Sequence, residues 1–199
     1  KTIPVNVYYS SYNNNGSGYA KGIELFWRDK KTIKNLDYWV SYSYLDTKRD
    51  YLNYPGQLTP NFAATHTASL VMKRFIMDIK TGFNFTYSYA TGRPYYNIMY
   101  NSGGNKYNIA DQGKTKDYHN LGFSMNYVPS IGKTNAKTFW VLVASITNVL
   151  GSNQVYGYNY SYNGLNKQPI EPTAKRFYFV GVFLSWGVDR TQDAINGNL

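Results

Sequence analysis

The two histidines are the first residues to consider for chemistry, because histidine is the side chain that most often acts as a general base near neutral pH. The sequence contains only His66 and His119, and we place both on strands near one end. A surface hydrolase or acyl-transfer site would set His66 beside a hydroxyl nucleophile, Thr65 or Ser69. Since no third residue that would orient the base can be identified, we favour structural histidines and predict no catalytic residues. The protein is not expected to be an enzyme.

The sequence contains no recognisable set of metal ligands and no cofactor-binding motif. There is no cysteine, and two separated histidines without a spaced carboxylate do not match a metal site. The glycine-containing segment Asn101–Asn105 is not followed by a GK[ST] sequence or by a predicted helix, so it is not a phosphate cradle. We therefore predict no metal ligand and no cofactor.

Tyrosines gathered in predicted loops suggest ligand binding instead. A tyrosine ring is rigid and apolar with a polar tip, which suits sugars, chelates or peptides. The loops hold many tyrosines, among them Tyr51, Tyr54 and Tyr160. The candidate substrate-binding residues are Arg93, Tyr95, Tyr96, Tyr107, Tyr156 and Tyr158.

Five charged residues fall on faces predicted to be polar. They would line a transport path or, in the interpretation that we favour, form a structural network of ion pairs, because charges removed from water must be paired. These residues are Glu24, Arg28, Asp37, Asp78 and Lys80.

Long amphipathic strands are the elements that would position these side chains. From Met77 to Tyr89, apolar or aromatic residues alternate with small polar ones, which is typical of a strand with one apolar and one polar face. Strands of ~10–13 residues are long enough to cross a bilayer core when tilted, whereas strands of soluble proteins usually run to ~5–6 residues. The sequence therefore predicts an all-β fold made of antiparallel transmembrane β-barrel strands. The alternative is a soluble β domain with a tyrosine-rich core, in which each buried hydroxyl would need a partner.

About eight strands are predicted, joined alternately by short turns and long loops. The strands cover residues 2–9, 19–28, 35–46, 64–73, 77–89, 117–128, 137–149 and 175–186, and the orientation of the seventh is open because it is apolar on both faces. The long loops are 47–63, 93–116 and 150–174, and 74–76 is a tight turn. Residues 1–188 would form barrel strands with long extracellular loops, and 189–199 a polar tail. Aromatic girdles at the strand ends would use Trp27, Tyr38, Tyr44, Tyr89, Tyr95, Tyr127 and Trp186.

Composition and charge support this interpretation. The mean hydropathy is −0.49 and no stretch approaches the ~18 consecutive apolar residues of a transmembrane helix. The net charge of +10 comes from basic residues near segment ends, not from a basic stripe. We therefore expect no nucleic-acid binding. Basic residues at loop bases, such as Lys116, Lys175 and Arg176, suit the phosphates of outer-membrane lipopolysaccharide.

Four segments resemble motifs of the TonB-dependent outer-membrane receptors. Gly18–Leu25 resembles their GxAxGxE strand, Ala90–Tyr95 their TGRPY segment and Ser145–Gly151 their NVL element, and Arg176–Trp186 is similar to their closing strand. The order and spacing match the last third of such a barrel, with a resemblance to members from Bacteroidetes. The polar residues after Trp186 depart from the family, whose barrels usually end on an aromatic.

The resemblance implies a location in the cell outer membrane and energised import of a scarce nutrient, whose class (siderophore, cobalamin, glycan or peptide) is open. It implies outer-membrane lipid as surroundings, the TonB complex as a partner through a plug that this chain lacks, and a surface lipoprotein as a further candidate partner. The chain would then begin inside a longer polypeptide, or follow a removed signal peptide. The alternative is an autonomous small outer-membrane barrel with a structural or adhesive role, since ~8 strands can also close.

Overall fold

The chain forms eleven β-strands in a computed structural model that describes residues 15–52, 54–133 and 138–187. Within these ranges no helix is long and apolar enough to cross a membrane. The first predicted strand, residues 2–9, and the polar tail 189–199 lie outside the described residues. The strands are β1 (Gly18–Asp29), β2 (Leu36–Arg49), β3 (His66–Ile76), β4 (Thr81–Ala90), β5 (Pro94–Asn101), β6 (Lys106–Lys114), β7 (Tyr118–Tyr127), β8 (Thr138–Thr147), β9 (Gly157–Tyr160), β10 (Lys167–Ile170) and β11 (Phe177–Trp186).

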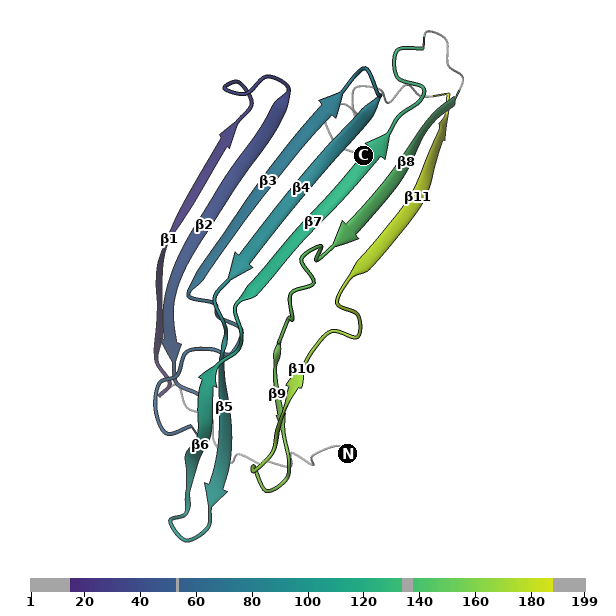
Figure 1. Ribbon diagram of the computed structural model, residues 1–199. Coiled ribbons are helices and arrows are strands. Elements are labelled where there is room, and N and C mark those ends of the chain that lie inside the picture. The colour runs from purple at the N-terminus through teal and green to yellow at the C-terminus, as the bar shows by residue number, and fades with distance from the viewer. Residues whose placement is uncertain (1–14, 53, 134–137, 188–199) are drawn as a thin grey trace.

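Seven of these strands form one antiparallel sheet in the order β1-β2-β3-β4-β7-β8-β11 (Figure 1). The seven strands are ten to fourteen residues long, which is the length that a tilted strand needs to cross a bilayer, ~9–11 residues. Short turns join the strands at one end of the sheet, which we call the short-turn end. The opposite, long-loop end carries two further hairpins, β5–β6 and β9–β10 (Figure 1).

The tight turn after β3 is shifted from its predicted place. Residues 74–76 belong to β3, where Phe75 and Ile76 pair with Gly82 and Thr81 of β4. The turn is formed by residues 77–80, in which Lys80 adopts a positive φ of 53° and its N–H donates to the carbonyl of Met77 at 3.0 Å. The alternation that begins at Met77 in the sequence therefore runs through this turn before it becomes a strand.

Two predicted long loops contain ordered hairpins, so the prediction of loop throughout 93–116 and 150–174 is wrong. In the first, β5 and β6 pair antiparallel, with an irregularity in register between Asn97 and Ile98. In the second, β9 pairs with β10 from Gly157–Ile170 to Tyr160–Lys167. The chain between the sheet strands at this end is thus folded back on itself.

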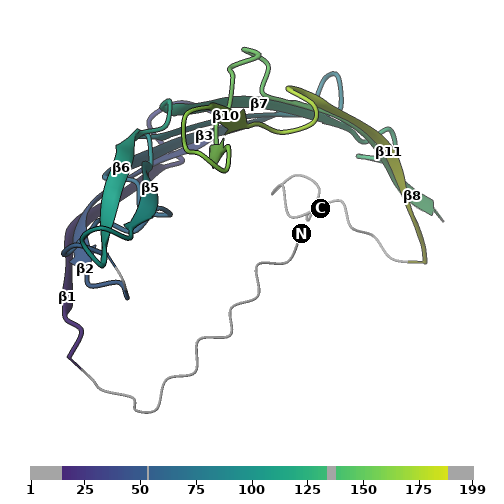
Figure 2. The ribbon, with the colours of Figure 1, turned by 90° about the horizontal axis from the view of Figure 1, so that it is seen from below.

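The sheet is curved, and its two faces differ in chemistry. Seen along the strands it is an arc (Figure 2). Residues with small polar side chains form one face, which includes Ser41, Ser69, Ser88 and Asn120. Two surface hollows, of about 530 and 510 Å³, open on this face, as expected for the inside of the curve. We call it the concave face.

The convex face is apolar and aromatic across all seven strands. Neighbouring rings pack on it, with ring centroids 4.9 Å apart for Phe85 and Phe123 and 5.4 Å apart for Trp27 and Tyr38. Many of its side chains are exposed, including Val180 at 82% and Ile23 at 62%. A soluble protein rarely exposes so large a continuous apolar surface, so this face needs an apolar surrounding.

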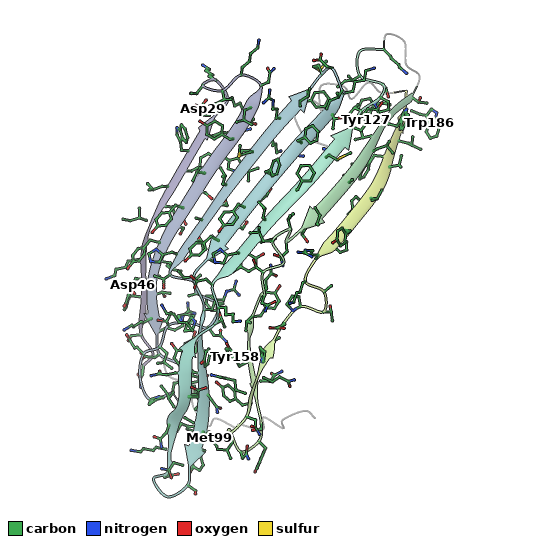
Figure 3. The ribbon with its side chains drawn as sticks, viewed as in Figure 1. Asp29, Asp46, Met99, Tyr127, Tyr158 and Trp186 are labelled. Atoms are coloured by element: carbon green, nitrogen blue, oxygen red, sulfur yellow. The ribbon has the colours of Figure 1, made fainter. Side chains whose placement is uncertain are left out.

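Most of the predicted girdle residues lie at the two ends of the convex face. Tyr127 and Trp186 lie at the short-turn end (Figure 3), together with Trp27 and Tyr38, which pair with Val40 and Asp29 of the neighbouring strands. Tyr44 and Tyr89 lie at the other end, where they pair with His66 and His119. Tyr95 does not belong to a girdle, because it lies in β5 outside the main sheet.

The small buried core explains why β8 is apolar on both faces. Phe139 and Val141 of β8 are 6% and 2% exposed and pack with Val128 and Ile131 of the preceding turn. These side chains lie on the concave face at the short-turn end, against Phe75 and Val143. The alternate residues, Trp140 to Ile146, fall on the convex face, where Leu142 and Ile146 pair with Tyr127 and Phe123 of β7.

Candidate functional site

The long-loop end of the sheet is built by the segments that stood out in the sequence. The first is the start of β1, where two glycines let β2 approach closely. A Cβ on Gly22 would lie 2.2 Å from the carbonyl oxygen of Tyr44, and one on Gly18 would lie 2.9 Å from that of Lys48. Between them, the Thr47 hydroxyl donates to the Tyr19 carbonyl at 2.7 Å. The glycines of this motif therefore serve strand packing.

The second segment, Thr91–Arg93, follows β4 and is hydrogen-bonded to β3 and to the segment that leads into β7. The Thr91 N–H donates to the His66 carbonyl of β3 at 2.9 Å, and the Thr91 hydroxyl accepts the His66 N–H at 3.1 Å. The Gly92 N–H donates to the Asp117 carboxylate at 2.8 Å. A Cβ on Gly92 would lie 1.9 Å from the Thr115 carbonyl oxygen, so only glycine fits at this position.

Arg93 follows directly and is fixed by its backbone. Its N–H donates to the Thr115 hydroxyl and its carbonyl accepts the Thr115 N–H, both at 2.9 Å. The Arg93 side chain itself is exposed. The Thr-Gly-Arg sequence therefore fixes the backbone of Arg93 at the mouth of the concave face.

The third segment is the turn after β8, organised by Asn148. This residue is 3% exposed and has a positive φ of 51°, a conformation that asparagine tolerates better than most residues. Its side-chain amide donates to the carbonyls of Ser152 at 2.9 Å and Lys175 at 2.7 Å. Its side-chain oxygen accepts the Ser152 N–H at 3.0 Å. Asn148 thereby joins the end of β8 to the segment that leads into β11.

A hollow of about 510 Å³ lies on the concave face beside the second of these segments, whose Thr91 and Arg93 line it. Its floor is formed by hydroxyl-bearing strand residues, among them Ser41, Ser69 and Ser88. Arg93, Lys116 and Tyr156 line its mouth. We call this hollow the mouth pocket. It brings together two of the predicted binding residues, Arg93 and Tyr156, and it adds Lys116, which the sequence suggested only as a contact for lipid phosphates.

Two other predicted binding residues meet in a cluster that joins the hairpins. The Tyr95 and Tyr158 ring centroids are 4.6 Å apart (Figure 3 labels Tyr158 between the hairpins). The Lys167 ammonium lies over both rings, at 4.7 and 4.9 Å from their centroids. The same ammonium donates to the Tyr95 hydroxyl at 2.7 Å and to Asp111 at 3.1 Å. We call these residues and Tyr160 the hairpin cluster.

Hydrogen bonds within the hairpin cluster shift the pKa values of its groups. Asp111 accepts hydrogen bonds from Tyr160 and Lys167, and these lower the pKa of its carboxyl. Desolvation and the hydrogen bond to Asp111 raise the pKa of Tyr160 to about 12. Hydrogen bonds to Tyr95 and Asp111 raise the pKa of Lys167. Near neutral pH the cluster thus holds one carboxylate and one ammonium, and it fixes β5–β6 to β9–β10.

The remaining two candidates, Tyr96 and Tyr107, lie apart from both places. Tyr96 hydrogen-bonds to Thr59, and burial is the main cause that raises its pKa. Tyr107 packs on Tyr100 across β5 and β6, with ring centroids 5.1 Å apart. The six sequence candidates are therefore divided between the mouth pocket, the hairpin cluster and these two separate positions.

The sequence does not identify Asp111, Tyr160 and Lys167 as a group, because it predicts loops over the segments that contain them. The tyrosines at 156, 158 and 160 are spaced by two residues, and that alternation was the signal for a short strand. The hydrogen bond between Tyr160 and Asp111 joins residues 49 positions apart in the sequence, and the one between Lys167 and Asp111 joins residues 56 positions apart. No local pattern indicates which partner such a residue meets.

The structure separates His66 from Ser69, one of its two candidate nucleophiles. His66 and His119 lie on the convex face, where their Nδ1 atoms pair with the hydroxyls of Tyr42 at 2.8 Å and Tyr87 at 2.9 Å. Ser69 falls on the opposite face of β3, where its hydroxyl pairs with that of Ser41 at 2.7 Å. The alternative of a His66–Ser69 dyad is therefore wrong. Among the described residues, no group of three or more His, Cys, Asp or Glu side chains is placed to hold a metal ion.

The charges predicted for the polar face are partly confirmed. Arg28 and Asp37 pair on the concave face, with Nε 2.8 Å from Oδ1, and Lys30 lies 3.8 Å from the same carboxylate. Arg28 and Lys73 also lie over the Trp39 ring, at 5.1 and 5.5 Å. Glu24 is exposed on the same face of β1. Asp78 and Lys80 do not lie on a strand face, because they belong to the turn between β3 and β4.

Comparison with known proteins shows the fold. No protein-family profile matches the sequence, and no curated protein matches it. Among solved structures, the chain is similar to the outer membrane transporter YddB from Escherichia coli, with a TM-score of 0.62 and 15% identity. The similarity covers 86% of this chain and 26% of that one, so the chain spans about a quarter of the transporter's length. The prediction of antiparallel transmembrane barrel strands is confirmed, with seven described strands in the main sheet and four further strands in the two hairpins, in place of about eight.

Proposed function

We propose that this chain forms part of the wall of a TonB-dependent outer-membrane transporter that imports a scarce nutrient. The observation that carries the proposal is the curved sheet of transmembrane length with an apolar convex face and a polar concave face. Lipid would cover the first face, and the second would line the lumen. The likeness to an outer membrane transporter supports the same role. The long-loop end then faces the outside of the cell.

The edges of the sheet support a wall that continues on both sides. Within the described residues, β1 and β11 each pair with one strand only, and they do not pair with each other. Both strands are exposed on both faces along most of their length. An unpaired edge of this length invites a neighbouring strand. We propose that further strands of the same barrel occupy both edges, which disfavours the alternative of an autonomous small barrel.

A matched pair of lysine substitutions tests the lipid-facing side. Phe85 and Thr86 are adjacent, both exposed and central in β4, but they lie on opposite faces. Phe85→Lys would set an ammonium near the bilayer midplane and should destabilise the folded protein by ~2–4 kcal/mol. Thr86→Lys would point into the lumen and should change stability by less than ~1 kcal/mol. Urea unfolding of the full-length protein in lipid vesicles measures both, and equal losses would contradict the assignment of the faces.

A binding experiment tests the dependence on TonB without knowledge of the nutrient. The full-length protein, purified in detergent, should bind the isolated periplasmic domain of TonB from the same organism, as measured by surface plasmon resonance. A porin from the same membrane, which is not energised, is the control and should not bind. Failure of the full-length protein to bind would favour a passive or structural barrel.

A further inference from the structure

The mouth pocket differs from the rest of the concave face in its charge. Arg93 and Lys116 line it, and no acidic residue does. Neither cation forms an ion pair with any residue in the described part of the chain. At the short-turn end, by contrast, the hollow of about 530 Å³ holds Asp37 and Asp78 among its cations. The mouth pocket is therefore lined by cations without any acid, whereas the hollow at the short-turn end mixes the cations Lys30, Lys73 and Arg74 with two acids.

The nearest carboxylate does not neutralise this charge. Asp117 follows Lys116 directly, but its carboxylate is bound by other groups. The Asp117 carboxylate accepts hydrogen bonds from the Gly92 N–H at 2.8 Å and from the Tyr89 hydroxyl at 2.9 Å. These bonds hold the pKa of Asp117 below its usual range. The Asp117 carboxylate is therefore held by Gly92 and by Tyr89 of the convex face, and it does not line the pocket, whereas Arg93 and Lys116 do.

Hydroxyl groups and tyrosine rings complete the pocket. The floor carries the side chains of Ser41, Thr67, Ser69 and Ser88. Ser41 and Ser69 bond to each other at 2.7 Å, whereas Ser88 makes no side-chain hydrogen bond to another described residue. Tyr118 and Tyr156, the second of which is 50% exposed, also line the pocket. Rings and hydroxyls together suit a ligand with an apolar face and several hydroxyl groups.

We propose that the mouth pocket binds an acidic sugar, in which a carboxylate or sulfate group meets Arg93 and Lys116 and the sugar hydroxyls meet the serine floor. Arginine pairs with such planar or tetrahedral anions through two parallel hydrogen bonds. Lysine adds a second positive charge that adjusts its position freely. This inference deepens the proposed function and rests on it, since it names the ligand class for the same outward-facing end of the wall.

Direct binding to the full-length protein in detergent tests the proposal. Isothermal titration calorimetry would compare trigalacturonate with its fully methyl-esterified form, which keeps the shape and loses the charge. A sulfated carrageenan disaccharide would serve as the second acid. We expect at least one acid to bind, and Arg93→Gln and Lys116→Gln each to weaken it by about 10-fold, the loss typical of one charge-assisted hydrogen bond. If trigalacturonate is that acid, its ester should bind about 10-fold more weakly or not at all.

Two further variants make the result specific. Arg93→Lys keeps the charge and should retain most of the affinity. Lys106→Gln removes another exposed lysine, at the tip of β5–β6 and outside the pocket, and should leave affinity unchanged. The proposal is overturned if neither acid binds, if ester and acid bind equally, or if the Arg93 and Lys116 variants bind as the wild type does. Binding needs no TonB, so these outcomes are separate from those that test energised import.

Discussion

Asn148→Ala is expected to lower the free energy of unfolding by about 3–5 kcal/mol. The substitution removes three side-chain hydrogen bonds, to Ser152 twice and to Lys175 once. Because Asn148 is 3% exposed, water does not readily replace them, and each buried partner left unpaired costs ~1–3 kcal/mol. Alanine is also less tolerant than asparagine of the positive φ at this position. Urea unfolding of the full-length protein in lipid vesicles measures the loss.

Two further variants distinguish the loss of side-chain hydrogen bonds from the strain of the positive φ, and from a general effect of substitution in this loop. Asn148→Gly relieves the backbone conformation but also loses the side-chain bonds, so it should recover at most ~1 kcal/mol of the loss. Asn153→Ala, an exposed asparagine of the same loop, should change stability by less than ~0.5 kcal/mol. If Asn148→Ala proved as mild as Asn153→Ala, Asn148 would not organise the turn.

Gly92→Ala is expected to have the second large effect. The added Cβ would lie 1.9 Å from the Thr115 carbonyl oxygen, so the Thr91–Arg93 segment must move away from the segment between β6 and β7. That movement breaks the hydrogen bond from Gly92 to Asp117 and shifts Arg93. Forcing extra atoms into a packed site typically costs ~1–3 kcal/mol, and the lost hydrogen bond to a charged group adds ~1.5–3 kcal/mol. The fraction of heat-modifiable barrel recovered in outer membranes should therefore fall.

Gly103→Ala is the matched control for Gly92→Ala. Gly103 lies at the tip of the β5–β6 hairpin, where a Cβ would come no closer than 3.5 Å to the Asn101 side chain. The hydrogen bond that its N–H makes to Asn101 can remain. This variant should assemble like the wild type. Equal assembly of the two alanine variants would contradict a steric role for Gly92.

The segments Gly18–Leu25, Ala90–Tyr95 and Ser145–Gly151 share a structural role. Gly18 and Gly22 allow two strands to approach, Gly92 fits beneath a carbonyl, and Asn148 caps a turn. Each segment therefore serves the construction of the long-loop end. Arg93 is the exception, since its backbone is fixed and its side chain is exposed. The structural part of the Thr-Gly-Arg segment thus positions a residue available for binding.

Strand ends were the least predictable part of the sheet. The alternation from Met77 to Tyr89 is continuous in the sequence, yet residues 77–80 form a turn. Alternation in the sequence indicates on which face of the sheet a side chain lies only if the backbone is extended. A turn with Lys80 at a positive φ breaks that condition without any glycine or proline to mark it. The register of Phe75 with Gly82 is a pairing between strands, which the sequence of one strand does not contain.

The sequence by itself determined the wall: its long strands, their apolar and polar faces and the segments that form its long-loop end. Period-two alternation is a local property, and lipid on one side and water on the other require it of each strand separately. Only the tertiary structure decided that two apparent loops are hairpins joined through Lys167, and that Arg93 and Lys116 share one pocket with a serine floor. These arrangements depend on contacts between segments far apart in the chain, which chain folding creates and no local spacing encodes.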